Sequence, residues 1–314
     1  MAETIYINKI YIIMCEHIDG CVQPGNSRSG LDLLKIDAVT DSFFAGFIRK
    51  NKENVGIVGM GSVGRALWAV MTYYYNVVGY DIIGAYDWSK ILQCDALFIC
   101  VQTPGAHDGR LDCSHVDEVL QKLLKDNYEG IVIIKSTLRV GFMDEAIRKY
   151  PTLNLVYSPE FMSEKKAFEW TANPDRIVLS GKTEFLDYVQ SLYFWAENAK
   201  FIRTDFKTAE IGKLAHNAYI ALKVTFTNTM ESISESAGAN AADVMKIVYS
   251  DRRVANSAHL EPFKGPYGGK CVPKDTNELI NAFFNQTKLL KTADEINTAL
   301  ISSTNGFAPT KETE

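Results

Sequence analysis

The chain has 314 residues, of which 46% are hydrophobic and 23% are charged, and its net charge at pH 7 is −5. These values are typical of a folded, water-soluble protein of about two domains. The negative charge argues against nucleic acid as a partner, and no uninterrupted apolar run is long enough to cross a membrane. Six cysteines without the spacing of a disulfide framework indicate a reducing compartment, so we expect a cytoplasmic protein.

Residues 1–54 form an N-terminal extension to which the sequence assigns no role. Within it, Cys15, His17 and Cys21 faintly resemble a metal-binding group. They lack a second pair at zinc-finger spacing, so we expect no metal site.

From residue 55 to residue 204, short apolar runs alternate with helical patterns. The expected strands are Val55–Val58, Asn76–Asp81, Asp95–Val101, Gly130–Lys135, Leu153–Tyr157 and Arg176–Ser180. The expected helices between them are Arg65–Tyr75 and Ser114–Lys125. Continuous apolar strands that alternate with helices are typical of a doubly wound parallel sheet, so we expect an α/β, Rossmann-type domain.

Residues 205–314 contain no further strand pattern and are expected to form an all-α domain. The expected helices are Thr208–Ala237, Ala241–Tyr249, Lys274–Asn285 and Leu289–Ser303. The fold class predicted from the sequence is therefore a Rossmann-type sheet followed by a helical dimerisation and substrate domain.

A glycine-rich turn joins the first expected strand to the first expected helix. Its residues are Gly59, Met60, Gly61, Ser62, Val63 and Gly64, which fit the pattern G-x-G-x-x-G. Such a turn lets the backbone approach a pyrophosphate at the N-terminus of a helix. Asp81 closes the next expected strand, where a carboxylate accepts a hydrogen bond from a ribose 2′-hydroxyl and repels a 2′-phosphate. The turn and Asp81 together predict NAD as the cofactor.

Cys271 follows a Gly-Gly pair and precedes Pro273-Lys274-Asp275. The pair is hard to explain by packing, because glycine weakens regular structure. Neighbouring Lys270 and Lys274 are expected to favour the thiolate, which is the nucleophilic form of cysteine. We interpret Cys271 as a nucleophile, and a buried structural thiol is the alternative.

Other polar residues are expected to meet near this cysteine. Lys213 and Asn217 are four residues apart and share one face of a largely apolar helix, where a substrate oxyanion would satisfy them. Glu160 and Thr137 each follow an expected strand, and ligands of open α/β sheets bind at the carboxyl ends of the strands.

These motifs, in this order, resemble the UDP-glucose/GDP-mannose dehydrogenase family over about residues 55–303. The motifs are Gly59–Gly64, Thr103-Pro104, Lys135-Ser136-Thr137, Ser158-Pro159-Glu160-Phe161, Asn173-Pro174-Asp175-Arg176, Lys213 with Asn217, and Gly268-Gly269-Lys270-Cys271-Val272-Pro273-Lys274-Asp275. The resemblance implies oxidation of a nucleotide-sugar C6 alcohol to a carboxylate, with NAD as hydride acceptor.

The resemblance also implies a role for each matching residue. Cys271 forms a thiohemiacetal and then a thioester, and Glu160 with Thr137 directs water to it. Lys213 and Asp275 assist removal of the alcohol proton, and Lys213 with Asn217 stabilises the oxyanion. Further matching positions are Thr103, Thr137 and Glu164 for the cofactor, and Tyr267 and Gly268 for the substrate. Arg253 matches an arginine that reaches the substrate bound to the partner subunit. The helix at 208–237 matches the contact between the two subunits of a homodimer.

The chain departs from the family at several points. It ends near residue 314 without the expected third domain, and the segment between Asp81 and Asp95 is short enough to have lost a helix and a strand. Gln102, Lys165 and Lys270 replace the usual residues. Two alternatives therefore stay open: a two-electron dehydrogenase of a smaller hydroxy substrate, and a non-catalytic relative that binds NAD or dimerises.

Overall fold

The computed structural model describes residues 53–252, 254 and 258–303. The predicted N-terminal extension, with Cys15, His17 and Cys21, lies outside the described residues except for its last two positions. Arg253, expected to contact the substrate, also lies outside them.

Five parallel strands form one sheet in the order β2-β1-β3-β4-β5. They are β1 (Asn54–Val58), β2 (Asn76–Tyr80), β3 (Ala96–Ile99), β4 (Ile131–Ile134) and β5 (Asn154–Tyr157). A parallel pair, β6 (Arg176–Leu179) and β7 (Lys200–Arg203), joins β5 through an antiparallel bridge between Tyr157 and Ser180. The order reverses beside β1, as expected for a doubly wound sheet.

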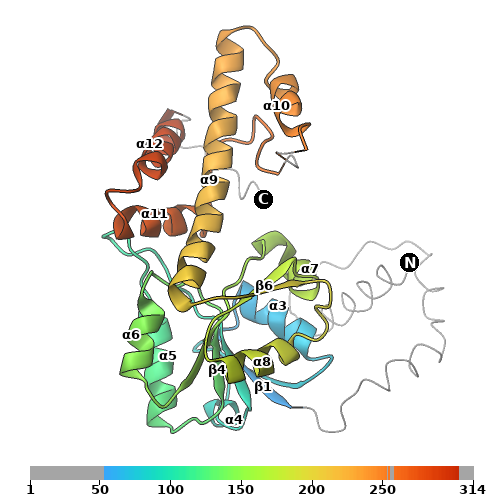
Figure 1. The fold of residues 1–314 in the computed structure, drawn as a ribbon, viewed down its shortest axis with the longest axis vertical. Helices are drawn as coiled ribbons and strands as arrows, with labels where there is room; N and C mark the ends of the chain where they lie inside the picture. Colours follow the sequence, from blue (N-terminus) through green and yellow to red (C-terminus); the bar gives the residue numbers. More distant parts are fainter. Residues whose placement is uncertain (1–52, 253, 255–257, 304–314) are drawn as a thin grey trace, which may run out of the picture.

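Helices connect successive strands and cover both faces of the sheet (Figure 1). They are α3 (Ser62–Met71), α4 (Trp88–Ile91), α5 (Ser114–Lys125), α6 (Phe142–Lys149), α7 (Ala167–Ala172) and α8 (Thr183–Leu192), with a short 3-10 helix at Glu164–Lys166. Only the four-residue α4 lies between β2 and β3, in agreement with the short segment seen in the sequence.

Side chains alternate across the sheet and divide the core into two layers. Leu97 and Ile99 pack with α5 and α6, whereas Ala96 and Phe98 pack with α3 and α8. The other strands follow the same alternation, so each needs apolar side chains on both faces. This requirement explains the continuous apolar runs in the sequence.

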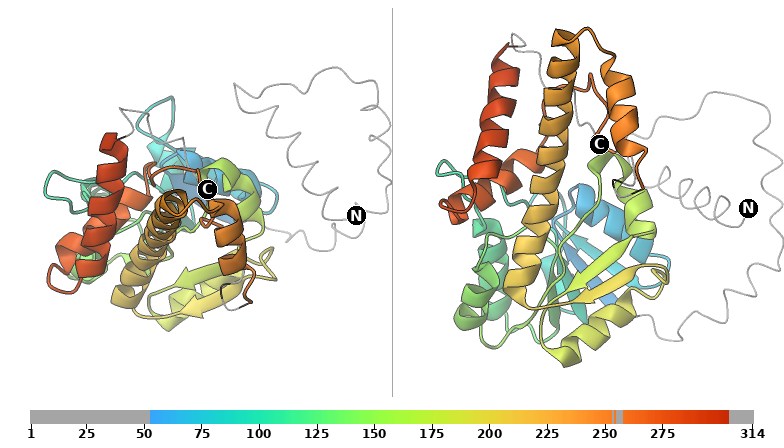
Figure 2. Two further views of the ribbon diagram at one scale, coloured as in Figure 1. Left: turned by 90° about the horizontal axis from the view of Figure 1, so that it is seen from above. Right: turned by 45° about the horizontal axis from the view of Figure 1, so that its top comes forward.

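After β7 the chain becomes helical. It contains α9 (Phe206–Ser236), α10 (Ala241–Tyr249), α11 (Val272–Ala282) and α12 (Lys288–Ser303). The long α9 rises away from the sheet, with α10 on one side and α12 on the other, and α11 packs beside the lower half of α9, below α12 (Figures 1 and 2). Among the described residues, no helix combines the length and apolar character needed to cross a bilayer.

Candidate active site

A cleft of about 670 Å³ separates the carboxyl edge of the sheet from α9 and α11. Its lining includes several residues that the sequence singled out: Gly61, Ser62, Val63, Thr103, Thr137, Glu160, Glu164, Lys213, Tyr267, Gly268 and Cys271. These residues come from six separate parts of the chain, and the fold brings them to one cavity. The cleft is therefore the candidate active site.

The glycine turn forms one end of the cleft. Gly59 has a φ of +96°, which favours glycine, and a Cβ at Gly64 would lie 1.9 Å from the Gly59 carbonyl oxygen. Helix α3 begins immediately after Gly61, and no described side chain caps its first turn. Its exposed N–H groups and the open space at Gly61 fit the pyrophosphate of a dinucleotide.

Two glycine substitutions should separate folding from ligand approach. Gly64→Ala should lower the free energy of unfolding by about 2 kcal/mol, because the new methyl group overlaps backbone. Gly61→Ala meets no atom within 4 Å, so it should leave thermal stability unchanged but weaken NAD binding. Thermal melting and calorimetric titration with NAD measure the two effects. Equal melting temperatures for the two variants would contradict this account of the turn.

Asp81 and Glu164 both contact the glycine turn, Asp81 from the end of β2 and Glu164 from the 3-10 helix. The Asp81 carboxylate follows β2 and accepts from the Met60 backbone N–H at 2.7 Å. Glu164 accepts from the Ser62 hydroxyl at 2.8 Å and lies 4.0 Å from the Lys270 ammonium. Both carboxylates therefore lie next to the glycine turn, and their contact with a cofactor stays a prediction.

Cys271 is exposed in the cleft and is the N-cap residue of α11. The sequence placed the start of this helix two residues later, at Lys274 instead of Val272, and so missed the helix N-terminus beside the thiol. The expected support from Lys274 is reduced, because its ammonium pairs with Asp275 at 2.6 Å. In the structure, the thiol therefore lies at the N-terminus of α11, and only Lys270 of the two flanking lysines is not paired with Asp275.

The other described cysteines are buried and electrostatically unsuited to nucleophilic attack. Burial raises the pKa of the thiols of Cys94 and Cys113 to about 11 and that of Cys100 to about 12. Each thiol therefore stays protonated at neutral pH. Cys271 is the exposed thiol of the described part of the chain.

Lys213 projects from α9 into the cleft and is 7% exposed. Burial lowers the pKa of its ammonium, although the charges of Asp275 and Cys271 oppose that effect. Asn217, one turn along α9, donates its amide N–H to Asp275 Oδ2 at 2.5 Å. Asp275 is fully buried, so Asn217 and Lys274 together hold its carboxylate next to Lys213.

The ring of Phe161, which follows Glu160, lies next to two cationic side chains of the site. Its ring centroid lies 5.3 Å from the Lys213 ammonium and 4.2 Å from the Arg176 guanidinium. His216 packs edge-on against the same ring at 5.5 Å, and burial lowers the pKa of its imidazole to about 4. His216 is therefore neutral at working pH and adds no charge beside Lys213.

Two sets of residues that hold the cleft were not found from the sequence. Asn297 of α12 accepts from the Tyr267 N–H at 2.8 Å and donates to the Tyr267 carbonyl at 3.1 Å, while the Tyr267 hydroxyl donates to Asp294 at 2.8 Å. This polar clamp fixes the start of the loop that carries Cys271.

On the other wall, the buried Glu278 carboxylate pairs with Arg110 at 3.0 Å and accepts from the Leu111 N–H at 2.6 Å. It ties the loop after Thr103 to α11. In the sequence, these contacts are indicated only by a polar residue, Asn297 or Glu278, within a periodic helix. Such a residue is a weak indication of a buried contact.

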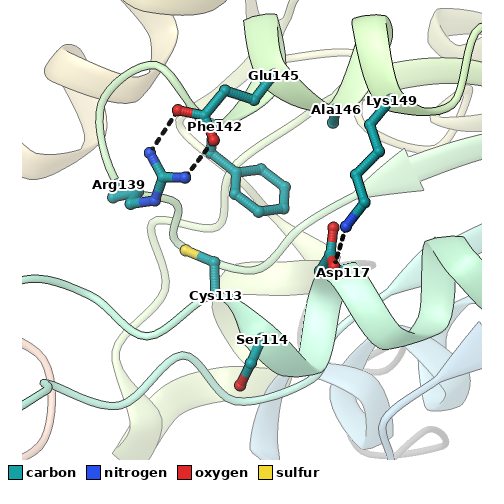
Figure 3. Close-up of a pocket in the computed structure, with 8 residues that line it drawn as sticks. All are labelled: Cys113, Ser114, Asp117, Arg139, Phe142, Glu145, Ala146 and Lys149. Atoms are coloured by element: carbon teal, nitrogen blue, oxygen red, sulfur yellow. Dashed lines mark hydrogen bonds and ion pairs between the residues drawn. The ribbon is translucent and has the colours of Figure 1, made fainter.

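A separate cavity of about 280 Å³ lies between α5 and α6 (Figure 3). The charged side chains that line this cavity form ion pairs with one another. Arg139 bonds both oxygens of Glu145, and the Lys149 ammonium lies 2.6 Å from the Asp117 carboxylate. These pairs leave no unpaired charge to hold a ligand there. The cleft next to Cys271 therefore remains the candidate site.

Comparison with known proteins agrees with this arrangement. Residues 84–195 match the model of the UDP-glucose/GDP-mannose dehydrogenase family, NAD binding domain, and residues 207–299 match that of the family's central domain. The chain belongs to the UDP-glucose/GDP-mannose dehydrogenase family. The first match begins at residue 84 and includes neither the glycine turn nor Asp81. The interpretation of the turn as a dinucleotide-binding site therefore depends on the geometry of the turn alone.

Individual relatives support the same assignment. The UDP-glucose 6-dehydrogenase of Campylobacter jejuni is 31% identical over 210 residues, covering 65% of this chain and 53% of that protein. A UDP-glucose dehydrogenase structure from Pyrobaculum islandicum aligns with a TM-score of 0.70 at 23% identity, covering 79% of this chain and 68% of the other. The UDP-D-ManNAc dehydrogenase structure from Pyrococcus horikoshii gives a TM-score of 0.72 at 20% identity, covering 81% and 70%. The structural likenesses establish the fold, and the chain spans about half the length of the curated relatives it matches.

Proposed function

We propose that the chain oxidises the C6 alcohol of a UDP- or GDP-linked sugar to a carboxylate, with NAD as the hydride acceptor. One observation carries the proposal: a single cleft contains both the dinucleotide-type glycine turn and Cys271. Lys213, Glu160 and Thr137 line the same cavity, so acid–base and nucleophilic groups surround the space next to the glycine turn.

Residues of the sheet domain fit the cofactor. The N-terminus of α3 would hold the pyrophosphate, Asp81 would accept from a ribose 2′-hydroxyl, and Thr103, Thr137 and Glu164 would complete the cofactor site. Bound NAD supplies a two-electron acceptor for each hydride removed from the sugar. In this scheme residues 55–204 bind the cofactor, and residues 205–314 contribute the substrate side.

The chain's own residues then divide the chemistry. Lys213 and Asp275 assist removal of the C6 hydroxyl proton while a hydride leaves C6, which gives an aldehyde. The Cys271 sulfur adds to the aldehyde carbon, and Lys213 with Asn217 stabilises the oxyanion. Loss of a second hydride from that carbon gives a thioester. Glu160 and Thr137 direct one water to the acyl carbon, the C–S bond breaks, and a carboxylate and the thiol are released.

Substrate recognition is assigned to the loop before Cys271 and to Arg253. Tyr267 and Gly268 line the cleft beside Cys271, and the clamp by Asn297 and Asp294 leaves the Tyr267 backbone in a fixed position. Arg253 contributes to this side by family resemblance alone.

We further assign the contact between two copies of the chain to α9. Tyr219, Phe226 and Ile233 recur every seven residues along this helix and are 64%, 45% and 55% exposed. A heptad stripe of this kind is typical of paired helices. Phe226→Glu should weaken the dimer about 30-fold in sedimentation velocity, because it puts a charge at the buried centre of the contact. Phe284→Glu, at an exposed phenylalanine beyond α11, should leave the assembly unchanged, and equal effects of both would contradict the assignment.

A panel of UDP- and GDP-sugars with NAD tests the proposed activity. At least one hexose with a C6 hydroxyl should release NADH, whereas its 6-deoxy analogue should release none. NADH from no member of the panel, with NAD bound normally, would favour the non-catalytic alternative. One NADH per substrate would favour the two-electron alternative.

A further inference from the structure

Lys135 is a buried cation for which neither the fold nor the proposed steps yet give a role. It follows β4 at the carboxyl edge of the sheet, and it is 6% exposed. A buried ammonium requires a partner that compensates for its lost hydration. Its position in the wall of the cleft places that partner in the same cavity as Cys271.

The partner is Glu160. The Lys135 ammonium lies 3.2 Å from Glu160 Oε2 and donates to the Tyr193 hydroxyl at 3.4 Å. The other carboxylate oxygen, Oε1, accepts from the backbone N–H groups of Phe161 at 2.7 Å and Met162 at 3.0 Å. Both oxygens of Glu160 are therefore fixed, one by the backbone and one by Lys135.

The charges around this pair keep both members ionised. Burial opposes the charge on Lys135, but the Glu160 carboxylate outweighs it and holds the pKa of the ammonium above its usual range. Burial also opposes ionisation of Glu160, yet Lys135 and the Phe161 N–H hold the pKa of that carboxyl below its usual range. Tyr193 and Cys100 face the same ammonium, and burial raises the pKa of both, so each stays neutral.

We propose that Lys135 is a positioning residue for hydrolysis of the Cys271 thioester, acting through Glu160. This inference rests on the proposed function. In the step, one water oxygen bonds to the acyl carbon, the C–S electron pair returns to sulfur, and the released proton passes by way of Glu160 to solvent. The carboxylate must hold water against the acyl carbon in one orientation, and the Lys135 contact fixes that orientation.

Lys135→Met removes the ammonium and keeps a side chain of similar length. Because the two hydride steps do not use Glu160, mixing the variant with NAD and substrate should give a burst of two NADH per site. Steady turnover should then fall about 100-fold, as expected for a misplaced catalytic group. Acid quenching and peptide mass analysis should find the acyl group on Cys271. Burst and steady phases slowed equally would overturn the inference, because a merely structural role predicts that result.

A double-mutant cycle tests whether Lys135 acts through Glu160. In a Glu160→Gln background, Lys135→Met should cost less than about threefold in steady turnover, because the group it positions is already lost. The double variant replaces the ion pair with two neutral groups. It therefore leaves no uncompensated buried charge, which could otherwise cause misfolding. Additive losses would overturn the inference.

The exposed pair between Lys149 and Asp117 provides a matched control. Lys149→Met breaks a lysine–aspartate contact between α6 and α5 and should leave both kinetic phases as in wild type. If wild type releases no NADH with any sugar nucleotide, the proposed function fails and the inference fails with it. If wild type turns over and Lys135→Met matches it, the inference alone fails.

Discussion

Replacing Cys271 by serine should reduce NADH formation from a sugar nucleotide by about 1,000-fold or more. The sulfur is the atom proposed to bond to the aldehyde carbon, and a serine hydroxyl is a far weaker nucleophile without an adjacent base. The loss should appear in kcat rather than in the affinity for NAD, because Cys271 belongs to the α11 side of the cleft. Stopped-flow absorbance at the NADH band, with calorimetric titration of NAD, measures both quantities.

The fold should survive this substitution. Cys271 is the N-cap residue of α11, and serine is among the preferred residues at that position. As a matched control, Cys94→Ala removes a buried thiol beside the amino end of β3, on the opposite edge of the sheet from the cleft. The control should retain turnover. Undiminished turnover by Cys271→Ser would remove the covalent mechanism and leave the two-electron alternative.

Replacing Lys213 by methionine should lower kcat about 100- to 1,000-fold, the loss typical of a missing oxyanion donor. Methionine fills the same buried space between α9 and Phe161, so folding should be retained. The affinity for NAD should change little, because Lys213 lies on the helical side of the cleft. Steady-state kinetics over a range of substrate concentrations separates kcat from KM.

The pH dependence of the wild-type enzyme provides a second readout of Lys213. The ammonium stabilises the oxyanion only while it is protonated, so that contribution is present below its pKa and lost as pH rises through it. Because burial lowers this pKa, the alkaline decline in kcat should begin below the range of an ordinary lysine. Lys213→Arg keeps its charge at high pH and should shift the decline upward. An identical alkaline limb in both enzymes would show that another group causes it.

The fold was predictable because its main elements follow local periodicity. The expected bounds of α5 and α10 agree with the structure at both ends, and each strand expected from an apolar run is present. The sequence missed β7, in which only Phe201 and Ile202 are apolar and the flanking Lys200 and Arg203 are charged, so no strand pattern is visible. It also missed α4, α6, α7 and α8, to which no helical pattern was assigned between the expected strands or after the last of them. The division at about residue 204 agrees with the end of β7, and the functional boundaries of the two parts stay a prediction.

The candidate site was predictable where its residues follow strands or glycines. The carboxyl ends of parallel strands meet at one edge, which is why Thr103, Thr137 and Glu160 line one cleft. The predicted helix began at Lys274 and left Pro273 outside it, although proline is favoured in the first turn of a helix and Pro273 lies in the first turn of α11. That error hid the position of Cys271 as the N-cap residue.

Contacts between distant residues were beyond the reach of local patterns. Glu278 and Arg110 lie 168 positions apart, and nothing in either segment indicates the other. The pairing of Lys135 with Glu160 depends in the same way on how β4 and β5 sit side by side. The sequence supplied the reactive groups of the site, whereas their supporting contacts required the three-dimensional arrangement.

A count of NADH per sugar under single-turnover conditions tests the central claim most directly. The enzyme is mixed in excess over the sugar nucleotide that is active in the panel, with saturating NAD, and the product is identified by mass. Wild type should release two NADH for each sugar and yield the 6-carboxylate, with the acyl intermediate carried on Cys271. A single NADH per sugar with an aldehyde or ketone product would contradict the four-electron oxidation assigned to this cleft.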